Sequence, residues 1–376
     1  MRECRLLFFF LSLLALLVNP WFVSFSQTRP EGRSSSLSEI EQKAVIGRDL
    51  IFHRKYDEAT QHFKKLALDY PSSLTGSFGQ MAIWQARMFE NYDFPFDKEF
   101  EEISETNKKL TEKVLGDPQA SAWELFLAGA GSGLRSFYFM RKGSALKSLG
   151  EANTAKRALQ RAIEKDPSFS DVYLGLGMFD FWRSVYTNRI KFFPFFSDKR
   201  AAGLAQMERA NREGRVIGSL GDFALAFSYY QDRNPAKGIP PLENALKKYP
   251  DNVIAKNLLA SLYIMRGSTP QAQAVIDSLL KSNPEITVAK YFKAYTYYRE
   301  KKLPEARHWY EDYLTTKPTN EWTSYTLYDL GMISLRENKE TEAYEDFKKA
   351  YRADSNNSAA LKQLQALRRK EPRFGK

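Results

Sequence analysis

The sequence predicts an all-α protein in which pairs of helices stack into a solenoid. Two observations lead to this fold class, a repeated proline and a repeated pair of small residues. Pro250, Pro284 and Pro318 recur at intervals of 34 residues, and the stretch before each one reads as an amphipathic helix. A proline ends a helix because it lacks the backbone N–H and clashes with the preceding turn. The period therefore marks where one structural unit ends and the next begins.

Small residues stand at two fixed positions in each of these units. One position lies twelve residues before the proline, and the other lies twelve residues earlier still. The residues are Gly238, Ala272 and Ala306 at the first position, and Ala226, Ala260 and Ala294 at the second. A large side chain there would hold two helix backbones apart. Each unit is therefore expected to be two helices that approach closely at these positions.

This pattern resembles the tetratricopeptide repeat, a helix–turn–helix unit of 34 residues. Three further units carry the same kind of residues: Gly47, Ala59 and Pro71; Gly143, Ala155, Ala162 and Pro167; and Gly331, Ala343 and Ala350, with Ser355 in place of the proline. The resemblance implies a right-handed superhelical solenoid of about seven units, one of which carries an insertion. Residues 358–370, SAALKQLQALRRK, are expected to form the C-terminal capping helix.

A second resemblance concerns the unit with the insertion. The run DVYLGLGMFDFW, the basic and aromatic insertion after it, and AAGLAQMERA are similar to a group of exported bacterial repeat proteins. That group is distantly similar to a eukaryotic inclusion-body-clearance family built on the same repeat. This resemblance implies a shape, and it implies no enzymatic activity.

The N-terminus has the layout of a secretory signal peptide. Two arginines precede the apolar run at 6–18, and small residues at 24–26 offer a cleavage site. The apolar run is shorter than the roughly 20 residues that span a bilayer. We therefore expect an exported protein of the periplasm or cell envelope of a bacterium, with an uncleaved N-terminal anchor as the alternative.

The expected domain layout follows from these features. Residues 1–26 are a signal peptide and 27–36 a flexible linker. Residues 37–135 hold an N-terminal repeat and an irregular helical hairpin, because 74–135 read as helical but fit the repeat poorly. Residues 136–357 are the repeat array, with an insertion at 183–199, and are followed by the capping helix at 358–370 and a tail at 371–376.

Charge and cysteine content narrow the possible partners. The formal net charge is +11, and +10 remains once residues 1–26 are removed. This surplus favours an acidic protein partner or peripheral contact with an anionic membrane, and nucleic acid is a poor candidate for an exported protein. Cys4, inside the signal, is the one cysteine in the chain. The mature chain therefore has no disulfide, no thiolate metal site and no thiol nucleophile.

The insertion lies where Gly177 and Gly203 are 26 residues apart instead of twelve. It contains the stretch RIKFFPFFSDKR, whose candidate functional residues are Arg189, Lys191, Phe192, Phe193, Phe195 and Phe196. Three roles are open for it. The stretch could fold onto the aromatic groove as a structural plug, cover a ligand site as a mobile lid, or insert into a lipid interface beside anionic head groups.

The resemblance also implies a concave groove lined by the first helix of each unit. Its expected lining is Met178, Phe181, Leu220, Phe223, Phe227, Tyr230, Asn257, Val288, Tyr291, Tyr295, Tyr298, Tyr325, Tyr328, Met332 and Leu335. Tyrosines suit peptide binding because they offer rigid contact area and a hydroxyl. The alternative is that these rings pack against neighbouring repeats. Asn257 alone suits the lysine–asparagine clamp for a C-terminal carboxylate, so that clamp is not predicted.

Nothing in the sequence points to catalysis, to a cofactor or to a metal. His53, His62 and His308 do not have the spacing of a metal site. The stretch GAGSG at 129–133 lacks the lysine of a phosphate-binding loop and is better explained by close helix packing. The sequence therefore predicts a non-enzymatic interaction scaffold or adaptor. The alternative is a module for lipid or another small apolar ligand, with the insertion as its lid or membrane contact.

Overall fold

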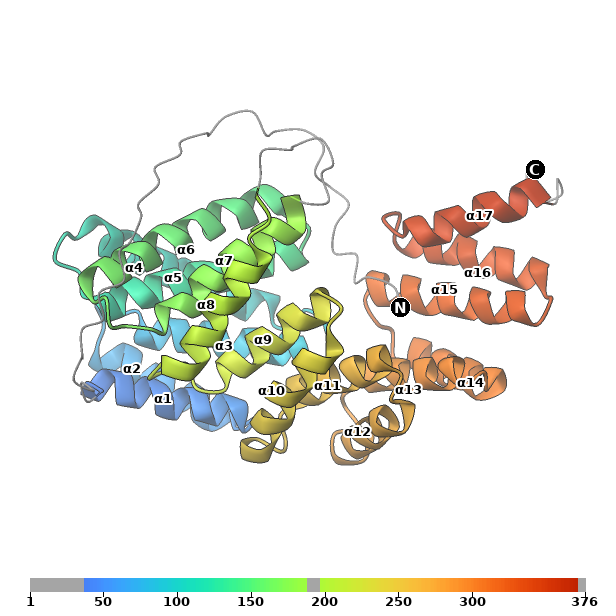
Figure 1. The fold of residues 1–376 in the computed structure, drawn as a ribbon, viewed down its shortest axis with the longest axis horizontal. Helices are drawn as coiled ribbons and strands as arrows, with labels where there is room; N and C mark the ends of the chain where they lie inside the picture. The colour runs from blue at the N-terminus through green and yellow to red at the C-terminus, as the bar shows by residue number, and fades with distance from the viewer. Residues whose placement is uncertain (1–36, 188–196, 371–376) are drawn as a thin grey trace.

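The computed structural model describes residues 37–187 and 197–370. Within these residues the chain forms 17 α-helices that pack in sequential pairs, so the predicted all-α repeat fold is confirmed (Figure 1). The helices are α1 Glu39–Phe52, α2 Tyr56–Asp69, α3 Thr75–Glu90, α4 Asp97–Gly116, α5 Ala122–Arg141, α6 Ala145–Lys165, α7 Val172–Thr187, α8 Arg200–Glu213, α9 Leu220–Gln231, α10 Pro235–Lys248, α11 Val253–Arg266, α12 Thr269–Ser282, α13 Val288–Arg299, α14 Leu303–Thr315, α15 Asn320–Arg336, α16 Glu340–Ala353 and α17 Ser358–Lys370.

The repeated prolines stand just after the second helix of three units. The helices α10, α12 and α14 end at Lys248, Ser282 and Thr315, two or three residues before each proline. Side-chain caps then start some of the next helices. Asn252 accepts a hydrogen bond from the Ala255 N–H, at 2.9 Å, before α11. Such a cap satisfies a backbone donor that the first turn of a helix leaves without a partner.

The small residues lie where paired helices meet. Ala226, Ala260 and Ala294, on the first helices of their units, are at most 1% exposed. A close backbone approach joins α7 and α8, the pair that flanks the insertion. A Cβ added to Gly177 would lie 2.5 Å from the Gly203 carbonyl oxygen, nearer than real Cβ atoms come to any neighbour. Glycine at both positions therefore allows the two backbones to touch.

Residues 74–135 form α3, α4 and most of α5, and their packing is partly polar. The Arg135 side chain is 2% exposed. Its guanidinium donates to Asn107 Oδ1 at 2.6 Å on α4, to Ser132 Oγ at 2.8 Å, and to Glu151 Oε2 at 2.9 Å on α6. A buried arginine with several partners replaces the purely apolar contact of an ordinary unit. This polar packing is the physical reason why the stretch fits the repeat pattern poorly.

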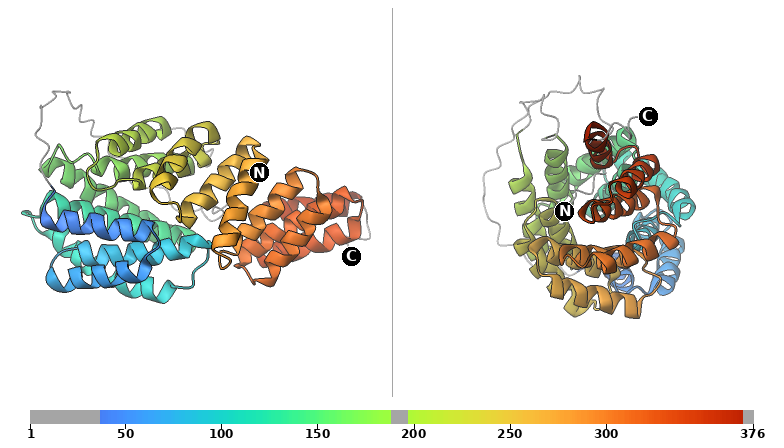
Figure 2. Two further views of the ribbon diagram at one scale, coloured as in Figure 1. Left: turned by 90° about the horizontal axis from the view of Figure 1, so that it is seen from below. Right: turned by 90° about the vertical axis from the view of Figure 1, so that its right-hand side faces the viewer.

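Helices α1 and α3 lie against helices from the middle of the chain. Figure 2 shows the helices wound about a common axis. Three hydrogen bonds, which we call the closure contacts, join segments about 170–200 residues apart: Tyr249 Oη to Asp49 Oδ1 at 2.8 Å, Asn252 Nδ2 to the Phe52 carbonyl at 3.1 Å, and Asn257 Nδ2 to the Glu90 carbonyl at 2.9 Å. The superhelix thus closes on itself, and α3 packs directly against α11.

An ionic network reinforces this closure. The Arg54 guanidinium contacts Glu90 Oε1 at 2.6 Å and Glu285 Oε1 at 3.0 Å. The Tyr56 hydroxyl also donates to Glu90, at 2.8 Å. Because the Glu90 side chain is only 9% exposed, these partners replace the hydrogen bonds that water would otherwise make to its carboxylate.

Several of the sequence predictions fall outside the described residues. They concern the signal peptide at 1–26, the linker at 27–36, the tail at 371–376, and insertion residues Arg189, Lys191, Phe192, Phe193, Phe195 and Phe196. In the stretches 37–187 and 197–370, no helix combines the length and apolar character needed to cross a bilayer.

Candidate partner-binding surface

The predicted groove residues fall into two groups by burial. Half-buried members are Met178, Phe223, Phe227, Tyr230, Tyr291, Tyr295, Tyr298, Tyr325, Met332 and Leu335, and Leu220 is exposed. Buried members are Phe181, Asn257, Val288 and Tyr328, with exposed fractions of 0%, 1%, 0% and 4%. The expectation that these four line a groove is corrected, because side chains this buried have no surface to offer a partner.

Asn257 has a structural contact that the sequence did not suggest. Its Nδ2 donates to the Glu90 carbonyl, at 2.9 Å, and so forms one of the closure contacts. Asn257 therefore joins α11 to the end of α3.

The rings of Phe223 and Phe227 on α9 pack against the protein's own first half. The Phe223 ring lies 5.1 Å from Phe52 on α1. The Phe227 ring lies 5.2 Å from Trp182 on α7 and 6.2 Å from Phe137 on α5. These rings hold the closed superhelix together, which corresponds to the alternative that the sequence left open.

The same ring network continues towards the C-terminal repeats. Phe89 at the end of α3 lies 5.2 Å from Phe137 and 6.4 Å from Tyr92. The Tyr92 ring in turn lies 5.5 Å from Trp322 near the start of α15. Aromatic side chains from α3, α5, α7, α9 and α15 thus converge, and of these rings the repeat pattern had selected only Phe227 on α9.

A different arrangement is found on α13 and α15. Tyr295 and Tyr298 stack with ring centroids 6.2 Å apart, and the Arg336 guanidinium lies 4.1 Å above the Tyr298 ring. Arg299 lies beside the Tyr295 hydroxyl. Burial raises the pKa of Tyr295, as does Asp329, and Arg299 only partly opposes this rise. We call Tyr295, Tyr298, Arg299 and Arg336 the Tyr–Arg surface.

Sequence reasoning missed the arginines of this surface. Arg266, Arg299 and Arg336 stand in the last turns of α11, α13 and α15, and all three are exposed. A cation is favoured there because the C-terminal end of a helix carries partial negative charge. Their recurrence in three successive units was a signal in the sequence. Each of these arginines lies beside a tyrosine, Arg266 at Tyr263, Arg299 at Tyr295 and Arg336 at Tyr298, and exposed cations beside rings suit an acidic partner.

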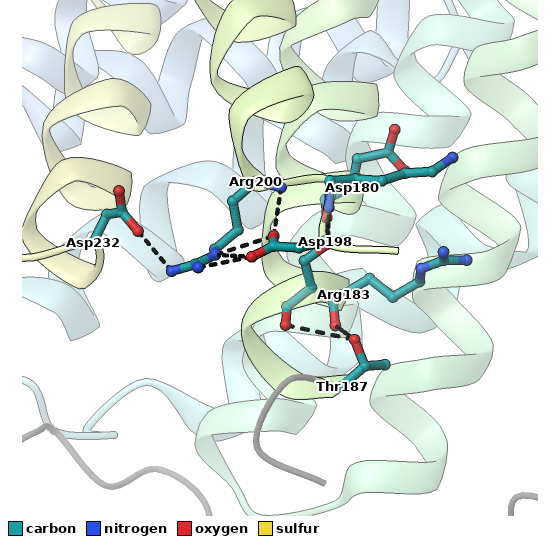
Figure 3. Close-up of polar contacts among 8 residues, drawn as sticks. Asp180, Arg183, Thr187, Asp198, Arg200 and Asp232 are labelled. Carbon is teal, nitrogen blue, oxygen red and sulfur yellow. Dashed lines mark hydrogen bonds and ion pairs between the residues drawn. The ribbon is translucent and has the colours of Figure 1, made fainter. Parts of the chain in front are cut away.

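The base of the insertion is held by short-range polar contacts (Figure 3). Ser184 Oγ on α7 accepts from the Lys199 N–H at 2.9 Å. The Arg200 guanidinium contacts Asp198 at 2.7 Å and Asp232 at 2.8 Å. Arg200, the last residue of the stretch RIKFFPFFSDKR, is thus engaged by two carboxylates.

His53, His62 and Asp171 make contacts that hold segments of the chain together. His62 Nε2 lies 2.7 Å from the Lys43 carbonyl, and the His53 ring lies 4.9 Å from the Tyr249 ring. Asp171 is fully buried and accepts three backbone N–H groups of the loop before α9. In the part of the chain that the structure describes, no three histidine or acidic side chains are grouped so that they could hold a metal.

Comparison with known proteins identifies the repeats. Tetratricopeptide repeat models match residues 138–169, 229–294 and 324–357. The chain therefore contains tetratricopeptide repeats, and repeats of this kind serve as scaffolds for protein–protein interaction. A search of curated proteins gives no match.

Several solved structures are similar to this chain. One is a tetratricopeptide repeat protein from Parabacteroides merdae, which is 17% identical, covers 77% of this chain and 98% of its own, and has a TM-score of 0.48. Another is the human IFIT1 dimer with m7Gppp-AAAA, at 14% identity, 90% and 78% coverage, and a TM-score of 0.45. A third is the P58(IPK) tetratricopeptide repeat domain, at 14% identity, 88% and 98% coverage, and a TM-score of 0.26.

Proposed function

We propose that the protein is a non-enzymatic scaffold of the bacterial cell envelope that binds an acidic segment of a partner protein on the Tyr–Arg surface. The observation that carries this proposal is the contact between Tyr298 and Arg336, because it joins two successive repeats into one basic aromatic surface. Export is supported by the signal-like layout of residues 1–26.

The partner is placed on the Tyr–Arg surface because the other predicted groove rings already contact side chains of the same chain. Phe223 and Phe227 are already in contact with Phe52, Phe137 and Trp182 of the same chain. The repeats α15–α17 lie at one end of the molecule, away from α1 and α2 (Figure 1). A partner that bound at Phe227 would have to displace the protein's own helices, whereas binding at Tyr298 leaves the closure contacts intact.

The acidic character of the partner follows from charge. Arg299 and Arg336 are exposed, and the mature chain carries a surplus of positive charge. An exposed arginine over a ring can bind a carboxylate without being buried, so little desolvation opposes the contact. Tyrosine and arginine are also the side chains most often found at the energetic centres of interfaces.

We expect Tyr298→Ala to weaken partner capture about tenfold or more, because it removes the ring shared by both repeats. Its cost in stability should be about 1 kcal/mol, the scale of one ring contact. Phe227→Ala should show the reverse, with a loss of stability of about 2–4 kcal/mol and a smaller effect on capture. The measurement compares the protein retained from an envelope extract with the urea midpoint of each variant.

Two results would contradict this proposal. One is equal retention of the partner by Tyr298→Ala and the unmodified protein. The other is a loss of capture that follows the loss of stability in both variants, because the rings would then act only as core. Leu68→Ala is the control, because Leu68 is an apolar residue of α2 that is 81% exposed and is not part of the Tyr–Arg surface.

A further inference from the structure

An exposed apolar patch lies at the start of α6. Leu146 is 67% exposed and Leu149 is 43% exposed, and the two side chains stand one turn apart on the helix. Gly150 beside them is exposed as well, and a Cβ added to it would meet no neighbouring atom within 4 Å. A single exposed leucine needs no explanation, but neighbouring leucines on one helix face indicate a contact surface.

The packing of the repeats uses the opposite side of α6. The helix packs against α5 and α7. The side chains buried on this packing face, each at most 7% exposed, are Ala155, Ala158, Leu159 and Ala162. At 3.6 residues per turn, these four residues lie opposite Leu146 and Leu149. Asn153 and Arg157 follow the leucines along the outer side, and both are exposed. In the described part of the chain, the outer side of α6 is therefore uncovered.

Cations surround the two leucines, and their charges are not neutralised. Lys147 and Lys156 lie on either side of the leucines around the helix, and Arg157 lies on the same outer side about 16 Å further along. Within residues 37–187 and 197–370, these three cations form no ion pair. Glu151, the acid that stands between them in the sequence, is bound to the buried Arg135 at 2.9 Å. The outer side of α6 therefore carries net positive charge around an apolar centre.

We call Leu146, Lys147, Leu149, Lys156 and Arg157 the α6 surface, and its composition favours lipid over protein. Aliphatic side chains at the centre can enter the boundary between head groups and acyl chains, while the long stems of lysine and arginine reach head-group phosphates. The centre of a protein interface instead favours aromatic residues and arginine, and it is depleted in lysine. The Tyr–Arg surface has that second composition, so the two surfaces suit partners of different chemistry.

We propose that the α6 surface docks the protein onto an anionic lipid surface, with Leu146 and Leu149 in the apolar boundary and the three cations against phosphate groups. The contact is peripheral and reversible, because two leucines bury far less apolar area than a membrane-spanning helix. This lipid contact does not depend on the proposed protein partner. Figure 1 shows α6 away from α15–α17, so lipid and a partner on the Tyr–Arg surface can be bound at once.

The test is sedimentation of the chain lacking residues 1–26 with vesicles of phosphatidylglycerol and phosphatidylcholine in equal parts, and with vesicles of phosphatidylcholine alone. One variant combines Leu146→Gln with Leu149→Gln, and its matched control is Leu68→Gln, at a leucine of α2 that is 81% exposed. Thermal unfolding shows whether each variant is folded.

A second pair of variants tests the charges in the same assay. One combines Lys147→Gln with Arg157→Gln. Its matched control combines Lys64→Gln with Lys108→Gln, at exposed lysines of α2 and α4.

We expect the unmodified chain to bind the anionic vesicles and to bind phosphatidylcholine alone much more weakly. The leucine variant should weaken partition into anionic vesicles about tenfold or more, because its polar side chains no longer enter the apolar boundary. The charge variant should weaken it by a similar factor at low salt and by much less at high salt, where charges are screened. Both control variants should bind like the unmodified chain.

A fluorescent probe reports the position of α6 itself. The chain lacking residues 1–26 has no cysteine, since Cys4 is the one cysteine in the sequence, so Leu149→Cys carries a single label. An environment-sensitive fluorophore there should shift to shorter wavelengths on adding anionic vesicles and be quenched by lipids that carry a nitroxide. The same label at Leu68→Cys should show neither change.

Three results would overturn the lipid contact of α6 and leave the proposed protein partner standing. The first is no binding of the unmodified chain to anionic vesicles, or equal binding by the folded leucine variant. The second is binding that is lost only on combining Phe192→Ser with Phe193→Ser, because the contact would then belong to the insertion. The third is a label at position 149 that emits at short wavelength without vesicles and does not respond to them, because the leucines would then be covered by protein.

Discussion

Arg54→Met is expected to destabilise the closed superhelix by about 3–5 kcal/mol, the usual cost of removing one partner from a buried ion pair. Glu90 is held by Arg54 at 2.6 Å and by the Tyr56 hydroxyl at 2.8 Å, and its side chain is 9% exposed. Without the guanidinium, the carboxylate remains buried beside one neutral donor. The same substitution also removes the contact of Arg54 with Glu285, which links the N-terminal helices to the middle repeats.

Hydrogen exchange is the appropriate measurement, because repeat proteins lose structure unit by unit. Protection should fall first in α1–α3 and in α11, while α15–α17 keep theirs. Arg212→Met is the control, because the Arg212 side chain is 67% exposed. A uniform loss over all helices, or no loss at all, would show that Arg54 does not hold the superhelix closed.

Asp171→Ala should cost a similar amount, about 3–5 kcal/mol, through a different mechanism. The Asp171 carboxylate accepts from the backbone N–H groups of Arg215, Val216 and Ile217, each at 2.8 Å. Val216 and Ile217 are buried, so water cannot readily replace the carboxylate. Removing it leaves backbone donors without partners and loosens the loop between α8 and α9.

Limited trypsin digestion and urea unfolding check this second result together. We expect faster cutting after Arg215 and a lower unfolding midpoint in Asp171→Ala, with an intermediate effect in Asp171→Asn, which keeps one acceptor oxygen. Asp277→Ala should change little, because its pairing with Lys293 involves a carboxylate that is 56% exposed. Unchanged cutting in Asp171→Ala would mean that other contacts fix the loop.

The repeat itself could be predicted from the sequence. Its signals are local, since prolines after α10, α12 and α14 and small residues such as Ala260 act within one unit or between neighbours. The irregular packing around Arg135 could be anticipated only as a poor match. A buried arginine gains its partners from three helices, and no periodic pattern announces them.

The closure could not be predicted, and it decides which groove residues remain available. The Tyr249–Asp49 contact joins residues about 200 positions apart, and nothing in a 34-residue pattern indicates how far the superhelix turns. Phe227 and Tyr295 therefore looked equivalent in the sequence. In the structure, Phe227 packs on Trp182, while Tyr295 lies on the Tyr–Arg surface.

Site-specific photocrosslinking in the source organism would show whether a partner protein binds on the Tyr–Arg surface. A photoreactive phenylalanine replaces Tyr298 in one variant and His308, an exposed residue of α14, in the other. We expect one adduct of defined mass from position 298 and none from position 308. The same adducts from both positions, or an adduct from position 308 alone, would show that the partner does not bind on the Tyr–Arg surface.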